Sequence, residues 1–318
     1  MLATVPRPLL LEDVEVVAVE RPTPSFVRLE LGSPALADFG VKGRPLADQR
    51  IKLVVPDAAG EPAPLHTLGE HWYAEWRDRP QPERGHLRTY SVREVRGHGV
   101  DTRVVVDIVV HPATPDTPLG PGARWAERAR VGDRVGLVGP RRGSLFGGIE
   151  FEPGAARRLL LVGDETALPA IASILAGLPD DAEGAVFLEV PTSADVVDLP
   201  RPDGVGLAWL PRDGAAHGAL LGAAVLAHLT HLEQPAALDL PDPDDVDPDL
   251  WETPVFSSSG EDVAAAPAAG DHADLYAWIA GEAGVVTALR RSLVRELGLH
   301  RRQVAFMGYW RRGSAVRD

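Results

Sequence analysis

Residues 158–171 read RLLLVGDETALPAI, and this stretch decides the fold of the second half of the chain. The run LLLVG is continuously apolar, which is typical of a strand buried on both faces of a parallel sheet. The turn GDET then leads into a predicted helix over about 166–178. Two interpretations of the turn stay open: a nucleotide site at the end of a strand, and a structural helix cap, because carboxylates favour a helix N-terminus.

The sequence after this stretch continues the alternation of strands and helices. The predicted elements lie at about 186–190, 205–210, 217–232 (helix), 275–281, 284–297 (helix) and 303–310. Short buried strands interleaved with helices are typical of a doubly wound parallel sheet. We therefore expect residues 151–318 to form an α/β domain with a doubly wound parallel sheet.

The first half has a different pattern, with several short strands separated by turns. The predicted strands lie at about 15–31, where a proline-marked turn joins two of them, and at 51–55, 89–95, 103–110 and 133–139. One short helix is predicted over about 122–130. Strands at this spacing are typical of a small antiparallel β-barrel, which we expect to occupy residues 1–150.

Residues 233–272 differ from both halves, because they contain PDPDDVDPD and AAAPAAG. Proline, acidic and small residues bury too little apolar surface to order themselves. A long acidic, proline-rich loop is expected here. Trp251 and Phe256 are the candidates for anchoring it.

The charge of the chain limits its partners. A net charge of −14 argues against nucleic acid and anionic membranes, and no apolar run reaches the ~18 residues of a membrane span. Fourteen acidic residues and no basic one lie between Arg212 and Arg290, and the remaining 32 acidic residues equal the 32 basic ones. The rest of the chain is therefore neutral and can form local basic pockets.

Cysteine is absent from the sequence. Its absence agrees with a reducing compartment and excludes disulfides, thiolate catalysis and cysteine-bound iron–sulfur clusters. Residues 1–17 also lack the pattern of a signal peptide, so a cytoplasmic protein is expected. We separately expect a monomer. If this protein transfers electrons, an organic cofactor must carry them.

The sharpest local motif is RTYS at residues 88–91. On a strand, Arg88 and Tyr90 point to one face and Thr89 and Ser91 to the other. Such an edge can offer a guanidinium to a diphosphate, an aromatic ring to a flat ligand and a hydroxyl to a ring nitrogen. Taken alone, these four residues also fit an exposed strand without a ligand.

A second motif, GPGARW at residues 120–125, is a turn at a predicted helix start. Free backbone N–H groups at such a start suit a phosphate. The barrel motif, this turn and the strand–turn–helix of 158–171 together resemble the ferredoxin reductase superfamily. More closely, they resemble its siderophore-interacting protein family of ferric-siderophore reductases.

The resemblance covers residues 14–313. Its most specific pieces are RTYSVR (88–93), GPGARWA (120–126), GDRVGLVGPRRGS (132–144), VGDETALPAI (162–171), YAWIAGE (276–282) and GYWRRG (308–313). It implies an FAD-binding β-barrel followed by an α/β domain that binds NADH or NADPH.

In the barrel, the resemblance implies that Arg88 lies near the FAD diphosphate, Tyr90 against the flavin or its ribityl chain, and Ser91 near flavin N5. The implied cofactor-binding residues there are Arg88, Thr89, Tyr90, Ser91, His111, Gly122, Ala123, Arg124 and Trp125. The family usually has serine at the position of Ala123 and a His-Gly pair at His111-Pro112. Backbone N–H groups must therefore replace a side-chain cap on the phosphate, and the role of His111 stays open.

In the second domain, the resemblance implies that the turn formed by Asp164, Glu165, Thr166 and Ala167 faces the nicotinamide. It also implies that Glu282, Tyr309 and Trp310 line the other side of the flavin, although core packing is the alternative for the two aromatic residues. Arg212 could contact a 2′-phosphate or be exposed to solvent. The choice between NADH and NADPH therefore stays open.

A ferric siderophore is the implied substrate, and its anionic oxygen ligands accept hydrogen bonds from cations. The sequence contains two lysines and 30 arginines, and Lys52 stands where the family places a basic residue beside the flavin. The candidate substrate-binding residues are Lys52, Arg141, Arg142, Arg311 and Arg312. Scattered surface positions are the alternative for each arginine.

The implied reaction is hydride transfer from the nicotinamide to FAD, followed by single-electron transfer to the Fe(III) of the siderophore. Hard oxygen ligands hold Fe(II) less tightly, so reduction releases the metal. No acid–base catalytic residue and no protein metal site is expected. The alternatives are a general flavin, quinone or ferric-chelate reductase, and a non-catalytic siderophore-binding protein.

Overall fold

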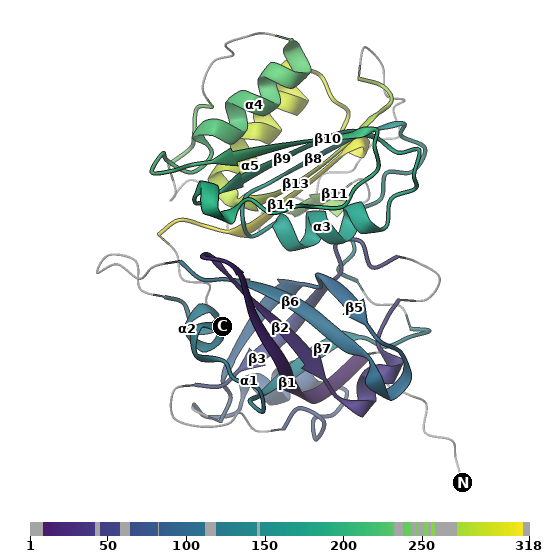
Figure 1. Cartoon of the computed structure of the whole chain (residues 1–318), viewed down its shortest axis with the longest axis vertical. Helices are drawn as coiled ribbons and strands as arrows, with labels where there is room; N and C mark the ends of the chain where they lie inside the picture. Colours follow the sequence, from purple (N-terminus) through teal and green to yellow (C-terminus); the bar gives the residue numbers. More distant parts are fainter. Residues whose placement is uncertain are drawn as a thin grey trace. The chain divides into compact units, whose positions relative to one another are not determined.

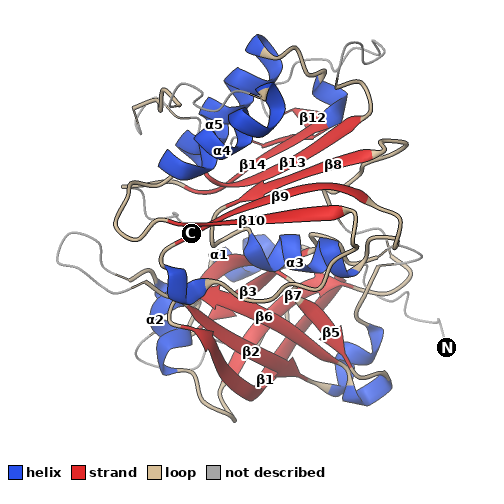
Figure 2. Cartoon of the chain, turned by 45° about the horizontal axis from the view of Figure 1, so that its top comes forward, coloured by secondary structure: helices blue, strands red, loops and turns tan. Residues whose placement is uncertain are grey.

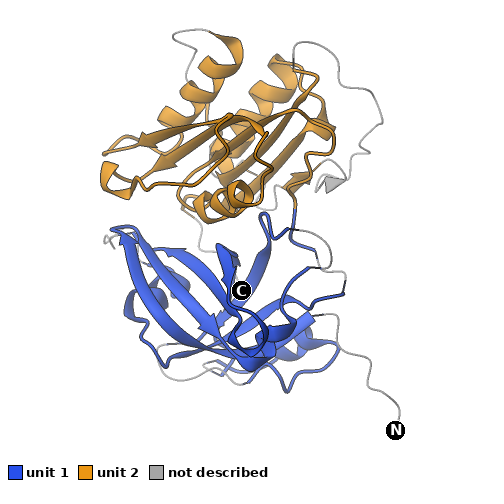
Figure 3. Ribbon diagram, turned by 45° about the vertical axis from the view of Figure 1, so that its right-hand side comes forward, with its two compact units in different colours: residues 1–149, 318 blue, residues 150–317 orange. Residues whose placement is uncertain are grey.

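Two units make up the chain, residues 1–149 and residues 150–317 (Figure 3). The computed structural model describes residues 9–41, 45–57, 64–81, 83–111, 119–144, 147–231, 238–242, 246, 251–253, 256–257 and 272–313. Each unit has its own sheet and its own apolar core.

Unit 1 is built on a curled antiparallel sheet (Figure 1). Its strands are β1 (Leu9–Thr23), β2 (Phe26–Gly32), β3 (Arg50–Val55), β4 (His86–Ser91), β5 (Glu94–Arg96), β6 (Arg103–Val109) and β7 (Arg134–Pro140). Across the sheet they follow the order β4-β3-β7-β1-β2-β6-β5. The antiparallel barrel expected for the first half is therefore confirmed as a half-barrel.

Alternating apolar residues explain how this sheet buries one face. The buried positions recur every second residue in β2 and β3, at Val27, Leu29, Leu31, Ile51, Leu53 and Val55. Because a residue and its second neighbour point to the same face of a strand, this alternation places one face in the main core. Val54 points the other way and packs in a smaller cluster with Trp76.

The helices of unit 1 are short. Helix α2 (Pro121–Arg128) begins one residue before the expected helix and ends two residues earlier. Helix α1 (Trp72–Arg77) is present in the structure but was not predicted from the sequence. It places Trp76 in the smaller cluster, where the indole Nε1 donates a hydrogen bond to the carbonyl of Arg84 at 2.8 Å, as a buried indole requires.

The single strand predicted over 89–95 is wrong, because β4 and β5 occupy this stretch as separate strands. Val92 N donates to Gln49 O at 2.8 Å, and Arg93 N donates to Val105 O at 2.9 Å. The backbone thus exchanges a partner beside β3 for one in β6 between two adjacent residues. Strand β1 also starts earlier than predicted, since residues 9–15 pair with β7.

Unit 2 contains a second sheet with the order β10-β9-β8-β13-β14-β11-β12. Its strands are β8 (Arg158–Gly163), β9 (Glu183–Val190), β10 (Val205–Pro211), β11 (Trp251–Thr253), β12 (Phe256–Ser257), β13 (Leu275–Glu282) and β14 (Val304–Trp310). Five neighbouring strands, β10, β9, β8, β13 and β14, pair in parallel. Their order is that of a doubly wound sheet. The expected α/β fold is confirmed, with an antiparallel edge formed by β11 and β12 that the sequence pattern missed.

Helices cover both faces of this sheet (Figures 1 and 2). Helix α3 (Leu168–Ala176) lies on one face, and α4 (Ala219–Thr230) and α5 (Ala283–Arg290) lie on the other. Residues 168–175 of α3 are all buried, which agrees with a helix that is apolar around its whole circumference. Among the helices of the described residues, none combines the length and the apolarity that crossing a bilayer requires.

The segment expected as a loop, 233–272, lies largely outside the described residues. In its described part, β11 joins the sheet edge by pairing Trp251 with Met307 of β14. The Trp251 ring stacks on Tyr309, with ring centroids 6.0 Å apart and planes at 13°. Trp251 therefore anchors this part of the chain to the sheet, while Phe256 lies in β12 opposite Thr253.

Candidate functional site

Strand β4 carries the RTYS motif at the edge of the unit 1 sheet. Ile51 of β3 pairs with Tyr90, and Lys52 pairs with Thr89. The Lys52 amine donates to Thr89 Oγ1 at 3.0 Å, so these two side chains share one face of the strand pair. Arg88 and Tyr90 lie on the opposite face, because neighbours along a strand alternate.

Helix α2 begins against the face that carries Arg88 and Tyr90. A β-carbon at Gly122 would lie 2.0 Å from Tyr90 Oη and 3.7 Å from Arg88 Cγ, so only glycine allows this approach. Residue Gly120 forms the N-cap without a side-chain hydrogen bond. The N–H groups of Gly122 and Ala123 have no acceptor within the helix and point out of its first turn.

This arrangement fits the diphosphate of a dinucleotide. A helix N-terminus attracts anions, and the Arg88 side chain, whose Cγ lies close to Gly122, carries a positive charge that suits a phosphate. Desolvation raises the pKa of Tyr90 to about 12, although the charge of Arg88 opposes this rise. The Tyr90 hydroxyl is therefore protonated at neutral pH and can donate a hydrogen bond to a ligand.

The remaining expected residues of unit 1 differ in how far they are buried. Ser91 is buried at the end of β4, opposite Arg50 of β3. Ala123 and Trp125 of α2 are half-buried and pack against the main core, whereas Arg124 is exposed. His111 is half-buried directly after β6, and Pro112 lies outside the described residues.

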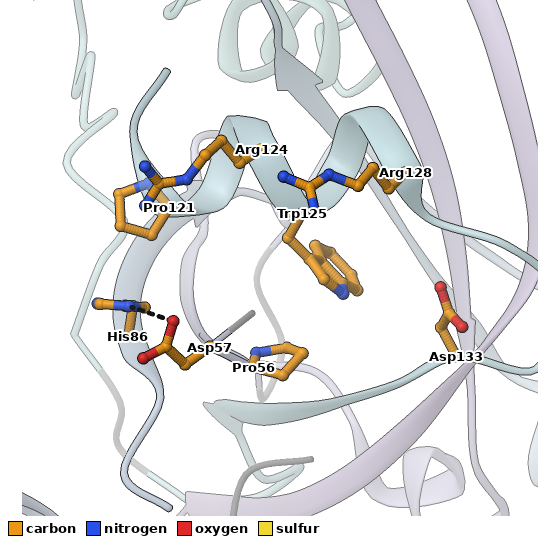
Figure 4. A pocket seen from close by; sticks show the side chains of 8 residues that line it. All are labelled: Pro56, Asp57, His86, Pro121, Arg124, Trp125, Arg128 and Asp133. Carbon is orange, nitrogen blue, oxygen red and sulfur yellow. Dashed lines mark ion pairs between the residues drawn. The ribbon is translucent and has the colours of Figure 1, made fainter. Parts of the chain in front are cut away.

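A pocket of about 140 Å³ opens beside α2 (Figure 4). Pro121, Arg124, Trp125 and Arg128 line it from the helix, and their spacing of three and four residues places them on one helix face. Across the pocket lies His86 of β4.

Several residues of this pocket escaped the sequence analysis, among them Pro56, Asp57, His86 and Arg128. His86 Nε2 lies 3.9 Å from Asp57 Oδ1. The periodicity of strands and helices could have found two of these residues. His86 stands two residues before Arg88 on a strand, and Arg128 stands four residues after Arg124 on a helix.

In unit 2, the carboxyl ends of β8 and β13 meet at the buried Asp164. One carboxylate oxygen accepts from the Thr166 backbone N–H at 2.8 Å and from its hydroxyl at 2.5 Å. The other accepts from Glu282 N at 2.8 Å and from Trp310 Nε1 at 2.7 Å. The strand order reverses between β8 and β13, which is where open α/β sheets bind ligands.

Burial and the neighbouring Glu165 raise the pKa of Asp164 to about 6, while its hydrogen bonds with Thr166 and Trp310 act in the opposite direction. The glycine Gly281 leaves room for this carboxylate, because a β-carbon there would lie 2.7 Å from Asp164 Oδ2. The turn after β8 is therefore tied to the end of β13 and to β14 by one buried acid.

A second buried network joins the ends of β8, β9 and β10. The Arg212 guanidinium donates to both oxygens of Glu165, at 2.8 and 2.9 Å, and to Glu189 Oε2 at 3.3 Å. Glu189 in turn accepts from Gly218 N at 2.8 Å and from Leu221 N at 3.2 Å, at the start of α4. Solvent exposure, one of the two alternatives for Arg212, is wrong, because its side chain is 6% exposed.

The other expected residues of unit 2 divide between surface and interior. Thr166 is partly exposed at the sheet edge, and Ala167 behind it is fully buried. Glu282 caps α5 by accepting from Val285 N at 3.0 Å. Trp310 lies beside Asp164, whereas Tyr309 points to the other side of β14 and stacks on Trp251.

The five basic residues expected at the substrate lie in both units. In unit 1, Arg141 forms an ion pair with Asp38 at 2.7 Å, and Arg142 Nη2 donates to the carbonyl of Phe39 at 3.3 Å. Lys52 is bonded to Thr89, as described above. In unit 2, Arg311 donates to Val246 O at 3.3 Å, and the backbone N–H of Arg312 donates to Glu282 Oε1 at 3.2 Å.

A half-barrel with a helix N-terminus that fits a dinucleotide phosphate, followed by a doubly wound sheet, is typical of a two-domain, flavin-binding class of protein. Residues 15–144 match the sequence model of the siderophore-interacting FAD-binding domain, and residues 156–313 match that of the siderophore-interacting protein. The chain belongs to the siderophore-interacting protein family, and FAD is the cofactor of its first unit.

Known relatives agree with this assignment. A siderophore utilization protein from T. fusca has a crystal structure that is 31% identical, with a TM-score of 0.66 over 98% of this chain and 96% of that one. The ferric vibriobactin reductase ViuB of Vibrio cholerae is 30% identical over 71% of this chain. Uncharacterized proteins of Mycobacterium tuberculosis and Mycobacterium bovis are 36% identical over 64% of it. The match spans 65% of the length of each of these curated relatives.

Proposed function

We propose that this protein is an FAD-dependent ferric-siderophore reductase that takes electrons from NADH or NADPH and releases iron as Fe(II). The observation that carries the proposal is the meeting of Arg88 and Tyr90 with the glycine-built start of α2. The printed name of the Vibrio cholerae relative, a ferric vibriobactin reductase, supports the choice of substrate.

Five residues of unit 1 would hold the cofactor. Arg88 and the N–H groups of Gly122 and Ala123 neutralise the diphosphate, and Tyr90 packs against the flavin or its ribityl chain. Ser91, buried at the end of β4, supplies a hydroxyl at the flavin end. A bound flavin supplies the exchange between the two-electron chemistry of a nicotinamide and the one-electron chemistry of iron.

The nicotinamide cofactor would bind at the carboxyl edge of the unit 2 sheet. Thr166 is the partly exposed residue of the turn after β8 and is the candidate for direct contact. Asp164 and Glu165 are buried and hold protein groups, so we assign them the positioning of this turn. Glu282 and Trp310 act in the same way through their bonds to Arg312 and Asp164.

Basic residues would bind the anionic siderophore complex, with Lys52 the first candidate. Desolvation and the nearby Arg50 charge lower the pKa of Lys52. Lys52 lies beside Thr89, on the opposite face of β4 from Tyr90. A ligand bound on this face of the strand pair, toward Ser91 and its partner Arg50, would meet the Lys52 amine. Arg142, Arg311 and Arg312 are the further candidates, and Arg141 is a weaker one because Asp38 pairs with it.

We also propose that the protein works as a monomer in the cytoplasm. The complete lack of cysteine suits a reducing compartment. Its acidic charge leaves nucleic acid an unfavourable partner.

The decisive experiment is anaerobic. The FAD-loaded protein is reduced with NADH or with NADPH, and flavin absorbance is followed after adding ferric hydroxamate, catecholate or citrate complexes, with an Fe(II)-specific chelator present. We expect flavin reoxidation together with the appearance of Fe(II).

Two results would contradict the proposal. If no ferric siderophore reoxidises the reduced flavin, the protein is not a ferric-siderophore reductase. If ferric EDTA and a quinone react as fast as every siderophore complex, the activity is that of a general reductase. A protein that binds siderophore but no flavin would favour the non-catalytic alternative.

A further inference from the structure

The carboxyl edge of the unit 2 sheet differs in charge from a site that would hold NADPH. We propose that this edge selects NADH over NADPH, because it presents an exposed carboxylate, Asp213, and no available cation to the adenosine ribose of the cofactor. Asp213 would act on the nicotinamide cofactor of the proposed function, so the selection rests on that function.

The strand order locates the part of the edge that meets the adenosine ribose. In doubly wound sheets, an acid near the end of the second strand accepts a hydrogen bond from the ribose 2′-hydroxyl of NADH, whereas an arginine nearby accommodates the 2′-phosphate of NADPH. The second strand of unit 2 is β9, and β10 pairs with it in parallel. The residues that follow β9 and β10 are therefore the ones that decide between the two cofactors.

Hydrogen bonds join the turns after these two strands. Arg212 N donates to Val190 O at 2.8 Å, and Asp213 N donates to Pro191 O at 3.1 Å. Ser193 N donates to Asp213 Oδ1 at 3.0 Å. Asp213 has a φ of 46°, a left-handed conformation that aspartate adopts more readily than most residues. Residues 191–195 and 212–216 thus form one surface, the ribose surface, on which Asp213 is exposed.

Arg212 precedes Asp213, but its guanidinium lies in the interior. It donates to Glu165 and to Glu189, and the side chains of all three residues are at most 6% exposed. The network contains two carboxyl groups for one guanidinium, so it offers no positive charge to a phosphate. Arg212 is therefore not the 2′-phosphate ligand that its position in the sequence allows.

The other basic residues of this region lie elsewhere. Residues 184–218, all of which the structure describes, contain Arg201 and His217 besides Arg212. Arg201 donates to the carbonyl of Val205 at 3.1 Å, and Val205 begins β10, so Arg201 lies at the opposite, amino edge of the sheet. His217 packs against Trp310 of β14, with ring centroids 5.0 Å apart. The strand β14 lies across β8 and β13 from β9.

The chemistry of Asp213 distinguishes the two cofactors. A carboxylate accepts several hydrogen bonds, so Asp213 can accept one from a ribose hydroxyl in addition to that from Ser193 N. The same carboxylate repels a 2′-phosphate, since like charges that face each other weaken binding. Asp195 cannot take this role, because it is fully buried and accepts from Thr192 N and Thr192 Oγ1.

The test measures binding without electron transfer. FAD-loaded protein is titrated in a calorimeter with NAD⁺ and NADP⁺, and with 5′-AMP and 2′,5′-ADP, which report on the adenosine end alone. We expect NADP⁺ to bind at least about tenfold more weakly than NAD⁺. The fragment 2′,5′-ADP should also bind more weakly than 5′-AMP.

Two matched pairs of variants assign the selection to the ribose surface. Asp213→Asn, which keeps a side chain that tolerates the left-handed turn, should strengthen NADP⁺ binding about fivefold and change NAD⁺ binding little. Asp203→Asn is its control, because exposed Asp203 precedes β10 at the amino edge. Ser193→Arg adds a cation to the ribose surface and should strengthen NADP⁺ and 2′,5′-ADP about tenfold. Ser193→Gln, which is uncharged, should not.

Equal Kd values for NAD⁺ and NADP⁺, or tighter binding of NADP⁺, would overturn the proposal. A ratio of Kd values that neither Asp213→Asn nor Ser193→Arg changes would also overturn it. These results leave the proposed function intact, because ferric siderophores can still reoxidise a flavin that NADPH has reduced. Selective binding of NAD⁺ together with a reduced flavin that no ferric siderophore reoxidises would instead support the selection of NADH and contradict the proposed function.

Discussion

At the scale of single residues, the absence of one β-carbon shapes the cofactor site. Gly122 lies so close to Tyr90 that any side chain would displace the phenol ring or the first turn of α2. The helix itself would prefer alanine at this position, since glycine costs roughly 0.5–1 kcal/mol in a helix. Close approach to Tyr90 is therefore the physical reason for glycine here.

Gly122→Ala is expected to weaken FAD binding by at least about fivefold, because overpacking of about 1–3 kcal/mol must be relieved by moving Tyr90. Titration with FAD measures this loss. Gly147→Ala is the matched control, since a β-carbon at Gly147 meets nothing within 4 Å. Equal FAD affinity of both variants would show that the phenol adjusts without cost.

Asp164 is a second residue with a measurable signature. Its pKa rises from 3.8 to about 6, so the folded protein binds this proton more tightly than the unfolded chain. The contribution to stability is full below about pH 4 and is lost as the pH rises through about 6. At about 1.4 kcal/mol per unit, the loss is about 2–3 kcal/mol.

Comparison with Asp164→Asn, which cannot titrate, isolates this effect. Between pH 4 and pH 7 the wild-type protein should lose about 2–3 kcal/mol of unfolding free energy relative to the variant. Urea unfolding at several pH values measures the difference. Asp180→Asn, at an exposed position, provides the baseline, and a pH-independent difference for Asp164→Asn would contradict the prediction.

At the scale of elements, Arg212 joins the carboxyl ends of three parallel strands. It follows β10 and binds Glu165 after β8 and Glu189 in β9, and Glu189 also caps the start of α4. The three side chains are almost fully buried. The turn after β8 is therefore held in position by charges buried at the carboxyl edge of the unit 2 sheet.

Arg212→Met is expected to destabilise the protein by about 3–5 kcal/mol, because two buried carboxylates lose their cation. Chemical denaturation measures the loss. The control is Arg158→Met, whose ion pair with Asp274 is exposed by 41% and 44% and should contribute at most about 1 kcal/mol. A similar small effect of both substitutions would mean that the buried network adds nothing to stability.

At the scale of the whole molecule, each unit is stabilised by its own core. The main cluster of unit 1 and that of unit 2 share no residue. Fourteen acidic residues between Arg212 and Arg290 give the excess negative charge to unit 2. The unit that binds the anionic cofactor FAD is thus the one without this acidic segment.

Calorimetry should therefore show two transitions, one for each core. Free FAD at 100 times its Kd stabilises the unit that binds it by about 2.7 kcal/mol, which raises its Tm by about 5–10 °C. The other transition should not move. A single transition that shifts as a whole with FAD would contradict the independence of the two units.

Particular residues show how far the sequence alone could reach. The apolar run at 158–163 predicts strand β8 correctly, and the motif at 88–91 lies on a strand, β4, as expected. The break between β4 and β5 could not be predicted from the sequence, because residues 92 and 93 have the pattern of a continuing strand. The break arises because the backbone of residue 92 bonds to a residue beside β3, whereas the backbone of residue 93 bonds to β6. Both partners are distant in sequence.

The sequence by itself determined the two fold classes, FAD as the cofactor and the family, because periodicity and short motifs record local backbone geometry and ligand chemistry. Tertiary structure alone decided which motif residues face outward and which are buried. Asp164, Glu165 and Arg212 look like cofactor contacts in the sequence, yet folding brings them together below the surface. The pocket beside α2 also exists only in three dimensions, since His86 and Arg128 become neighbours when β4 and α2 pack together.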